Sequence, residues 1–519
     1  MKSGLKAVVV LGLSQSLLWF AVATEAAPPA GDHRTPYDLV LRGGRVMDPE
    51  TGLDEVTQVA IRDGRIAAIS REPMHGLNEI DVTSLVVAPG FIDLHSHSPT
   101  PLGQHYQVLD GVTTALELEA GAFPVRDFGR LIREKPLINF GASVGYGSIR
   151  IELKHGLRQA HLVTDSPTPM GLRGYWTALR SFFVTPTEAF RERATPTERK
   201  RLRAMLGEGL AQGGIGIGLP LDYFSEAIDR DEVRMIFEVA AEAQTPVFIH
   251  LRRGVNGDPS GLREALSLAM ETGAAVHICH IQHNAMRNID LFLAEIAEAR
   301  EAGVDVSTEV LPYNAGSALI SSAVFGRDWR TIFDIDYGDV EWAATGERFN
   351  EAMWNTYRAA HPEGQVIHHY VDEAWTQRAL VEPGVMIVSD LLPMFDEGSK
   401  VAPHNGAFAK ILGPYVREEG LLDLMTALAK MTVLPARRLE AVAPVFKNKG
   451  RLRVGADADI TIFDPTLVVD RATYADPYRP SAGIVHVIVN GMLVVQDGKI
   501  RPEVYPGREL RGVPLVNAR

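Results

Sequence analysis

Four histidines and one aspartate stand where short apolar runs of the sequence end. His95 and His97 follow one such run, and because residues two apart on a strand face the same side, both imidazoles could grip one ion. His250, His280 and Asp390 each close a further apolar run. Imidazole nitrogens and carboxylate oxygens are ligands that catalytic zinc sites use. The pattern therefore predicts a metal site assembled from several strand ends.

The spacing of these residues indicates how the chain brings them together. His250 and His280 are 30 residues apart, about the length of one β/α unit, so we expect them at the ends of neighbouring strands. Asp390 ends an apolar strand with a charge. A buried carboxylate needs a partner, which a metal ion or a catalytic water would supply.

Composition narrows the chemistry further. The chain has 519 residues, a net charge of −13 and a single cysteine, Cys279. The acidic balance speaks against a nucleic-acid partner, since phosphate binding needs a basic surface. One cysteine excludes an intrachain disulfide and a zinc site built from cysteines, so histidines and carboxylates must hold any metal. Neighbours on a strand face opposite sides, and we therefore expect Cys279 to be buried and to face the helix layer.

Eight apolar runs with helical patterns between several of them predict the fold. Strands are expected over residues 91–97, 115–119, 139–145, 214–220, 247–251, 276–282, 304–312 and 385–390. Such alternation is typical of parallel β/α units, and eight of them indicate an α/β protein with a (β/α)8 TIM barrel over residues 91–446. Two stretches, about 153–195 and 320–365, are too long for plain connections and should fold over a barrel end. The second leads into a possible extra strand at 365–370.

Short alternating runs flank the barrel on both sides. Residues 37–90 contain an Asp-Gly turn between apolar runs, and residues 447–505 contain a second hairpin pattern. We expect the two segments to close into one composite β-sandwich formed by the N- and C-terminal parts of the chain.

The N-terminal residues have the pattern of a targeting segment. Residues 1–23 comprise two lysines, an apolar run and a small-x-small ending, which is the pattern of a cleaved signal peptide. The alternative is a membrane anchor, but the run is interrupted and shorter than the roughly 20 apolar residues that a span needs. We expect an exported, periplasmic protein without stable membrane insertion.

Several motifs resemble a known superfamily. Segment 89–97 resembles the first barrel strand of the amidohydrolase superfamily, and segment 455–464 resembles its C-terminal β segment. A finer resemblance is to the N-acyl-D-amino-acid deacylase branch, which contains D-aminoacylase and D-glutamate deacylase. It rests on segments 111–114, 144–150, 312–317, 406–413 and 430–438. The resemblance implies that Asp390 is the catalytic acid/base and, with four histidines, a metal ligand; the histidines are His95, His97, His250 and His280.

One predicted ligand position differs from the sequence pattern of the deacylase branch. D-aminoacylases place a cysteine after the Gly-Val-Thr-Thr strand, and here Ala120 occupies that position beside Glu119. Many other amidohydrolases bridge two metals with a carboxylated lysine on strand four, but residues 214–219 contain no lysine. We therefore expect a strand-two carboxylate as the bridge, Glu119 first and Glu117 next. The implied cofactor is Zn²⁺, as one or two divalent ions.

A small-molecule substrate with a free carboxylate needs a cation, and arginine binds carboxylates bidentately. The candidate substrate-binding residues are Arg252, Arg150, Tyr313 and Ser317. For Arg252 and its neighbour Arg253 the alternative is a surface or interloop salt bridge. The branch usually has an arginine shortly before the segment 406–408, whereas residues 403–405 here read Pro-His-Asn.

These observations predict a metal-dependent amidohydrolase. It would hydrolyse the amide bond of N-acyl-D-amino acids, with N-acyl-D-glutamate as one candidate, to a carboxylate and a free D-amino acid. One alternative is a cyclic-amide or dipeptide hydrolase of the same superfamily. Another is a non-catalytic exported metal-binding homologue. The presence of Asp390 argues against it, because a protein that only binds metal needs no residue to carry a proton.

Overall fold

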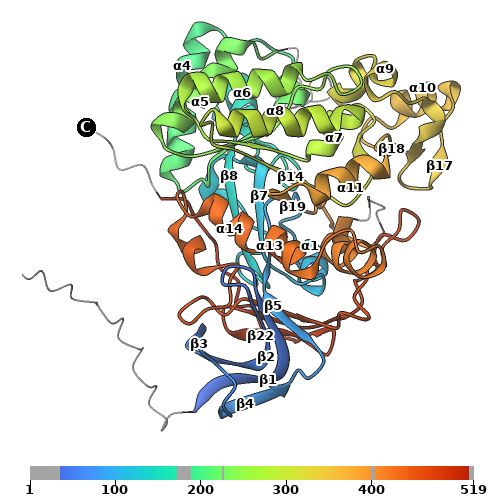
Figure 1. Ribbon diagram of the computed structural model, residues 1–519. Coiled ribbons are helices and arrows are strands. Elements are labelled where there is room, and N and C mark those ends of the chain that lie inside the picture. The colour runs from blue at the N-terminus through green and yellow to red at the C-terminus, as the bar shows by residue number, and fades with distance from the viewer. Residues whose placement is uncertain (1–35, 172–188, 225–226, 399–401, 403, 514–519) are drawn as a thin grey trace, which may run out of the picture. The chain divides into compact units, whose positions relative to one another are not determined.

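Eight short parallel strands form a barrel in the computed structural model, which describes residues 36–171, 189–224, 227–398, 402 and 404–513. The strands pair in chain order, and each runs parallel to its neighbours (Figure 1). They are β6 (Phe91–Asp93), β7 (Val112–Ala122), β8 (Asn139–Gly145), β11 (Ile217–Pro220), β12 (Val247–His250), β13 (Val276–Ile278), β14 (Val306–Val310) and β19 (Val385–Ile387). Each coincides with one of the strands expected from the sequence, so the predicted barrel is confirmed.

The first and last strands nearly close the barrel through their C-terminal extensions. Ser96 and Leu391 form an isolated parallel bridge, and the His97 N–H donates to the Leu391 carbonyl at 2.8 Å. The buried carboxylate of Asp93 accepts from the backbone N–H of Ser389 at 3.1 Å and from its hydroxyl. This seam places the residues after β6 beside the residues after β19.

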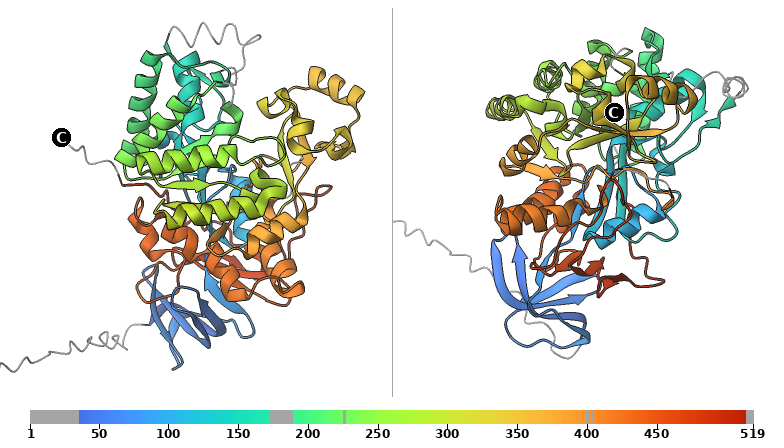
Figure 2. Two further views of the ribbon diagram at one scale, coloured as in Figure 1. Left: turned by 45° about the horizontal axis from the view of Figure 1, so that its top comes forward. Right: turned by 90° about the vertical axis from the view of Figure 1, so that its right-hand side faces the viewer.

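Amphipathic helices surround the barrel, as Figure 2 shows from two sides. They include α4 (Pro196–Ala211), α5 (Arg230–Glu242), α6 (Ser260–Thr272), α8 (Ile289–Glu301), α11 (Glu373–Val381) and α13 (Leu424–Met431). Helix α5 illustrates why they pack there: its buried residues Val233, Ile236 and Phe237 recur at helical spacing and form one stripe. Its N-cap, Asp229, accepts from the N–H of Glu232.

Strands from both ends of the chain share one mixed sheet of nine strands. The N-terminal part supplies β1 (Tyr37–Asp48), β2 (Leu53–Arg62), β3 (Arg65–Ser70), β4 (Gly76–Asp81) and β5 (Val86–Pro89); the C-terminal part supplies β20 (Ile460–Phe463), β21 (Ile484–Val489), β22 (Met492–Gln496) and β23 (Lys499–Ile500). The parts join where β5 and β20 pair antiparallel. The expected composite β unit is therefore present, as one continuous hydrogen-bonded sheet.

An insertion between β14 and α11 builds a small sheet with its own core. Its strands are β15 (Ala315–Leu319), β16 (Val340–Trp342), β17 (Glu347–Arg348) and β18 (Gln365–His369), and β18 is the extra strand expected from the sequence. Buried aromatic residues, Phe325, Trp329, Phe333 and Trp354 among them, form a separate apolar cluster. The insertion, yellow to orange, stands to one side in the left view of Figure 2.

The expected signal peptide, residues 1–23, lies outside the described residues. Among the residues that are described, no helix is both long enough and apolar enough to cross a membrane.

Candidate metal centre

The carboxylate of Glu119, near the end of β7, lies between two pairs of histidines. Its Oε1 is 2.8 Å from His250 Nδ1 and 3.1 Å from His280 Nε2. Its Oε2 is 3.3 Å from the Nε2 atoms of both His95 and His97. The structure thus brings together the four predicted histidines and the predicted bridging carboxylate, and Glu119 rather than Glu117 occupies the bridging place.

Asp390 completes the group on the side of His95 and His97. Its Oδ1 lies 3.5 Å from His95 Nε2 and 3.3 Å from His97 Nε2, and those two nitrogens are 3.1 Å apart. The side chain of Asp390 is 21% exposed, whereas that of His95 is 1% exposed. The group is therefore more accessible to solvent at Asp390 than at His95.

These separations match the edges of a metal coordination polyhedron. Zinc binds histidine nitrogen at about 2.0–2.1 Å, so two ligand atoms of one tetrahedral ion lie roughly 3.3 Å apart. The Nε2 atoms of His95 and His97 lie 3.1–3.5 Å from each other, from Glu119 Oε2 and from Asp390 Oδ1. The contact of Glu119 Oε1 with His250 Nδ1 is shorter, at 2.8 Å, so a second ion held by His250, His280 and Glu119 would need a small outward movement. The donor set fits one ion well and offers a place for a second.

Two of the ligand residues adopt left-handed backbone conformations. His280 has φ of 30° and Asp390 has φ of 50°, a region that non-glycine residues seldom occupy. Each residue follows the end of its strand, β13 or β19, where the chain must turn to aim the side chain into the group. Strain of this kind concentrates at functional sites, where the surrounding structure enforces it.

The pKa values at the centre favour ionised carboxylates. Burial raises the pKa of Glu119, but the charge of His95 and hydrogen bonds from His250 and His280 outweigh it and hold that pKa well below its ordinary value. Burial lowers the pKa of His95, but the charges of Asp390, Glu119 and Glu309 outweigh it and raise that pKa well above its ordinary value. The carboxylates stay ionised and create a demand for positive charge that a divalent ion would meet.

Two further carboxylates stand behind the two histidines that follow β6. His95 Nδ1 is 2.5 Å from Glu309 Oε1, and His97 Nδ1 is 2.8 Å from Glu117 Oε2. Burial raises the pKa of Glu309, but His95 and His277 outweigh it and lower that pKa to about 2. Sequence reasoning missed Glu309. The signal that could have found it is a glutamate inside the otherwise uncharged run of β14.

Cys279 is buried, as the sequence predicts, but it does not face the helix layer. Its sulfur lies within 4.8 Å of a ligand atom of His95 and of Glu309, on the inner side of the barrel. The prediction was wrong because β13 already ends at Ile278, so strand alternation no longer applies at the next residue. Burial raises the pKa of Cys279 well above its ordinary value, which keeps the group a neutral thiol.

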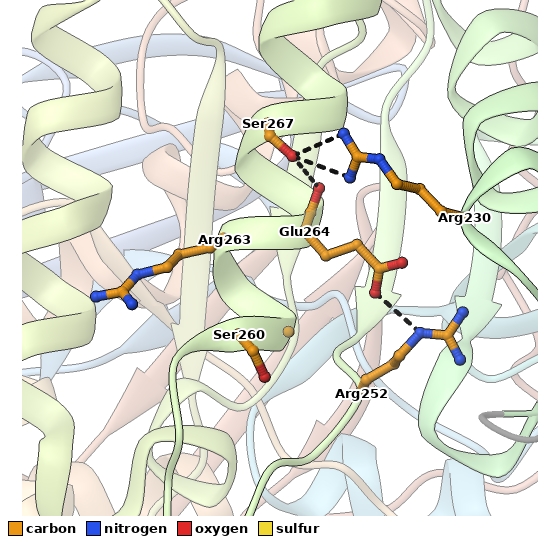
Figure 3. A pocket seen from close by; sticks show the side chains of 7 residues that line it. Arg230, Arg252, Ser260, Arg263, Glu264 and Ser267 are labelled. Atoms are coloured by element: carbon orange, nitrogen blue, oxygen red, sulfur yellow. Dashed lines mark hydrogen bonds and ion pairs between the residues drawn. The ribbon is translucent and has the colours of Figure 1, made fainter.

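Arg252 lies away from the metal centre. Its Nε donates to Glu264 Oε2 at 2.9 Å, and Figure 3 shows this pair at a hollow bordered by helix α6. The hollow is lined by Arg230, Arg252, Ser260, Gly261, Arg263, Glu264 and Ser267, and none of these is a metal-centre residue. Strand alternation would place Arg252, two residues beyond His250, on the same face, but β12 ends at His250, so the alternation does not reach Arg252.

Arg150 is fully buried in α2 (Tyr146–His155), where it forms an ion pair with Glu232. The hydroxyl of Tyr146 bonds the same carboxylate, and the Arg150 guanidinium also donates to the backbone carbonyls of Ala189 and Glu192. Its donors are therefore engaged inside the protein, and this geometry gives no support to a role in substrate binding.

The other two substrate-binding candidates lie in different surroundings. The Tyr313 ring stacks on His404 at 4.7 Å, and His404 Nδ1 is 2.8 Å from the Asp390 carbonyl oxygen, which places Tyr313 on the open side of the centre. Within the described part of the chain, the buried Tyr313 hydroxyl has no hydrogen-bond partner. Ser317 Oγ, in β15, donates to Gln365 Oε1 at 2.9 Å within the inserted sheet.

Arg253, for which the sequence indicates only a salt bridge, lies three residues beyond His250. The Arg253 guanidinium lies over the rings of Phe333 at 5.1 Å and Tyr370 at 5.7 Å. Asp222 is 3.8 Å from Arg253 and 2.8 Å from Arg327, so these two arginines share its carboxylate. The Arg253 side chain is 5% exposed, and its Nε has no partner among the described residues.

A β/α barrel with histidines and carboxylates gathered after its strands defines a metal-dependent hydrolase. Comparison with known proteins agrees: residues 86–494 match the amidohydrolase family. The chain belongs to that family.

Its relatives include two curated enzymes of Alcaligenes xylosoxydans xylosoxydans. An N-acyl-D-glutamate deacylase is 29% identical over 91% of this chain and 96% of its own length, and a D-aminoacylase is 30% identical over 89% and 95%. The fold matches the crystal structure of an N-acyl-D-glutamate deacylase from Bordetella bronchiseptica complexed with zinc and a phosphonate inhibitor. That match has a TM-score of 0.72 and 24% identity, and it covers 92% of this chain and 100% of the other.

The buried Arg150 pair yields a stability prediction. Replacing Arg150 with Met leaves the Glu232 carboxylate buried without its partner, which should lower the free energy of unfolding by about 3–5 kcal/mol. Denaturant unfolding measures the loss. Arg263→Met, which removes a 60% exposed arginine paired with Glu295, is the control and should cost at most about 1 kcal/mol. A raised KM with unchanged stability in Arg150→Met would instead support a substrate contact.

Proposed function

We propose that this amidohydrolase hydrolyses N-acyl-D-amino acids, acidic ones in particular, with N-acyl-D-glutamate as the first candidate. The observation that carries the proposal is the position of Glu119 between the histidine pairs, with Asp390 at the exposed edge. The names of the relatives at 29% and 30% identity favour an acylated D-amino acid over other amides. The products would be a carboxylate and a free D-amino acid.

The proposed cofactor is zinc, with His95, His97, Glu119 and Asp390 as ligands of one ion and His250, His280 and Glu119 as ligands of another. When bound, such an ion polarises the scissile carbonyl and makes water acidic enough to ionise near neutral pH. The zinc in the B. bronchiseptica deacylase structure supports this choice.

Asp390 is the proposed proton carrier. Burial raises its pKa, but the charges of His95 and His97 and a hydrogen bond from His97 outweigh it and hold the pKa well below its ordinary value. As a carboxylate at the exposed edge, it can accept the proton of the attacking water and then deliver it to the leaving amine. The Tyr313 hydroxyl, on the same side, is a candidate donor to the developing oxyanion.

Arg253 is the proposed anchor for a substrate carboxylate. Residues 403–405 lack the arginine that the deacylase branch usually has before segment 406–408. Arg253 lies three residues beyond the ligand His250, and its charge contributes to lowering the pKa of that histidine, which burial lowers most. An arginine near the centre with an unpartnered Nε can bind a carboxylate.

The proposed location is the periplasm, because residues 1–23 have the pattern of a cleaved export signal.

Amine release from matched D and L substrates tests the function. Zinc-loaded enzyme should release glutamate from N-acetyl-D-glutamate and little from the L isomer, and it should leave hydantoins and dipeptides intact. Asp390→Asn should reduce kcat by at least about 100-fold, because the proton carrier is lost. No release from any N-acyl amino acid by fully loaded enzyme would refute the deacylase, and unchanged activity of Asp390→Asn would refute the role of Asp390.

Adjacent arginines provide a matched test of the carboxylate anchor. Arg253→Met should raise KM for N-acetyl-D-glutamate by about 10- to 100-fold, since a charge-assisted hydrogen bond is lost. Arg252→Met should leave KM within about 2-fold, because Arg252 pairs with Glu264 instead. Melting temperatures of both variants control for folding. Equal KM values for the two variants would contradict the assignment.

A further inference from the structure

The two histidines that follow β6, His95 and His97, present opposite edges to different partners. Their Nε2 atoms face Glu119 and Asp390, whereas each Nδ1 faces a buried carboxylate on the far side. We propose that Glu309 and Glu117 are positioning residues that fix His95 and His97 in the tautomer with hydrogen on Nδ1. The Nε2 lone pairs are then free for the metal ion. This inference rests on the metal centre proposed above and is independent of the substrate.

The Glu309 carboxylate is held in turn by His277. His277 Nε2 lies 2.8 Å from Glu309 Oε2, and His277 Nδ1 lies 2.7 Å from Ser307 Oγ. His95, Glu309 and His277 are each at most 1% exposed. With Glu309 ionised and both imidazoles neutral, every contact is satisfied when both imidazoles donate to Glu309 and the Ser307 hydroxyl donates to His277.

Glu117 is held differently, because one oxygen serves two histidines. His97 Nδ1 and His161 Nε2 lie 2.8 Å and 2.7 Å from the same atom, Glu117 Oε2. Glu117 Oε1 accepts from the backbone N–H of Ala120 at 3.1 Å. His161 Nδ1 lies 2.8 Å from the hydroxyl of Thr164. Both oxygens of Glu117 therefore act as acceptors, and a hydrogen-bond donor does not fit at the position of either oxygen.

The separations at Glu309 and Glu117 are those of hydrogen bonds, which bring heavy atoms to about 2.5–3.0 Å. The contacts of Glu309 and Glu117 with histidine nitrogens span 2.5–2.8 Å. They are hydrogen bonds that support ligands, an arrangement typical of metal-binding histidines.

The difference between the two carboxylates gives a specific expectation for glutamine. In Glu309→Gln, the amide oxygen can still accept from His95, and the amide N–H can donate to His277 once that ring shifts its proton to Nδ1 and donates to Ser307. In Glu117→Gln, the amide N–H must face either the Ala120 N–H or the His97 Nδ1–H, even if His161 shifts its proton to Nδ1 and donates to Thr164. The first variant loses a charge, and the second loses a charge and a hydrogen bond.

Zinc affinity of the full-length protein, measured by competition with a chromophoric chelator, tests the proposal. We expect Glu309→Gln to weaken zinc binding by about 10-fold and Glu117→Gln by about 100-fold. Glu232→Gln, at an equally buried glutamate that pairs with Arg150, should reduce the melting temperature and leave zinc affinity unchanged. Unchanged zinc affinity in both test variants, or equal losses in the two, would overturn the proposal.

A second measurement needs no variant. ¹⁵N NMR of histidine side chains in the zinc-loaded wild type should show His95 and His97 protonated at Nδ1. An Nε2–H tautomer at either residue would overturn the proposal even if the variants failed to fold. Because neither experiment includes a substrate, these outcomes are separate from success or failure of the deacylase assay.

Discussion

The carboxylate of Glu119 is the point on which the centre depends. One oxygen faces the histidines that follow β6, and the other faces the histidines that end β12 and follow β13. Replacing a thiolate with a carboxylate provides two ligand atoms instead of one sulfur and a harder donor. The single residue therefore couples opposite sides of the barrel, and it makes a bridge available without a lysine on strand four.

The fold explains why such distant residues meet. Parallel strands in a closed ring present their C-terminal ends at one face, so side chains more than a hundred residues apart converge there. The seam between β6 and β19, tied by Asp93 and Ser389, holds Asp390 beside His95 and His97. Behind them, Glu309 and Glu117 hold the imidazoles by hydrogen bonds, so the side chains around the centre are themselves held in place by buried carboxylates.

Strand patterns predicted most of this arrangement. Eight apolar runs located the barrel, and residues at strand ends, such as His250 and Asp390, were identified because their placement follows from topology alone. Alternation failed one or two residues past a strand, where the backbone turns, and this misplaced Cys279 and Arg252. Glu309 was missed because its partner His95 is 214 residues away, and a local pattern cannot indicate that contact.

Anomalous diffraction at the zinc edge, from crystals of the full chain grown with zinc, tests the central claim most directly. The account predicts a strong peak bounded by His95, His97, Asp390 and Glu119 Oε2. It predicts a second, weaker peak between Glu119 Oε1 and the two histidines His250 and His280. Zinc bound between Cys279 and Glu309, or a protein saturated with zinc that has no peak beside Glu119, would contradict it.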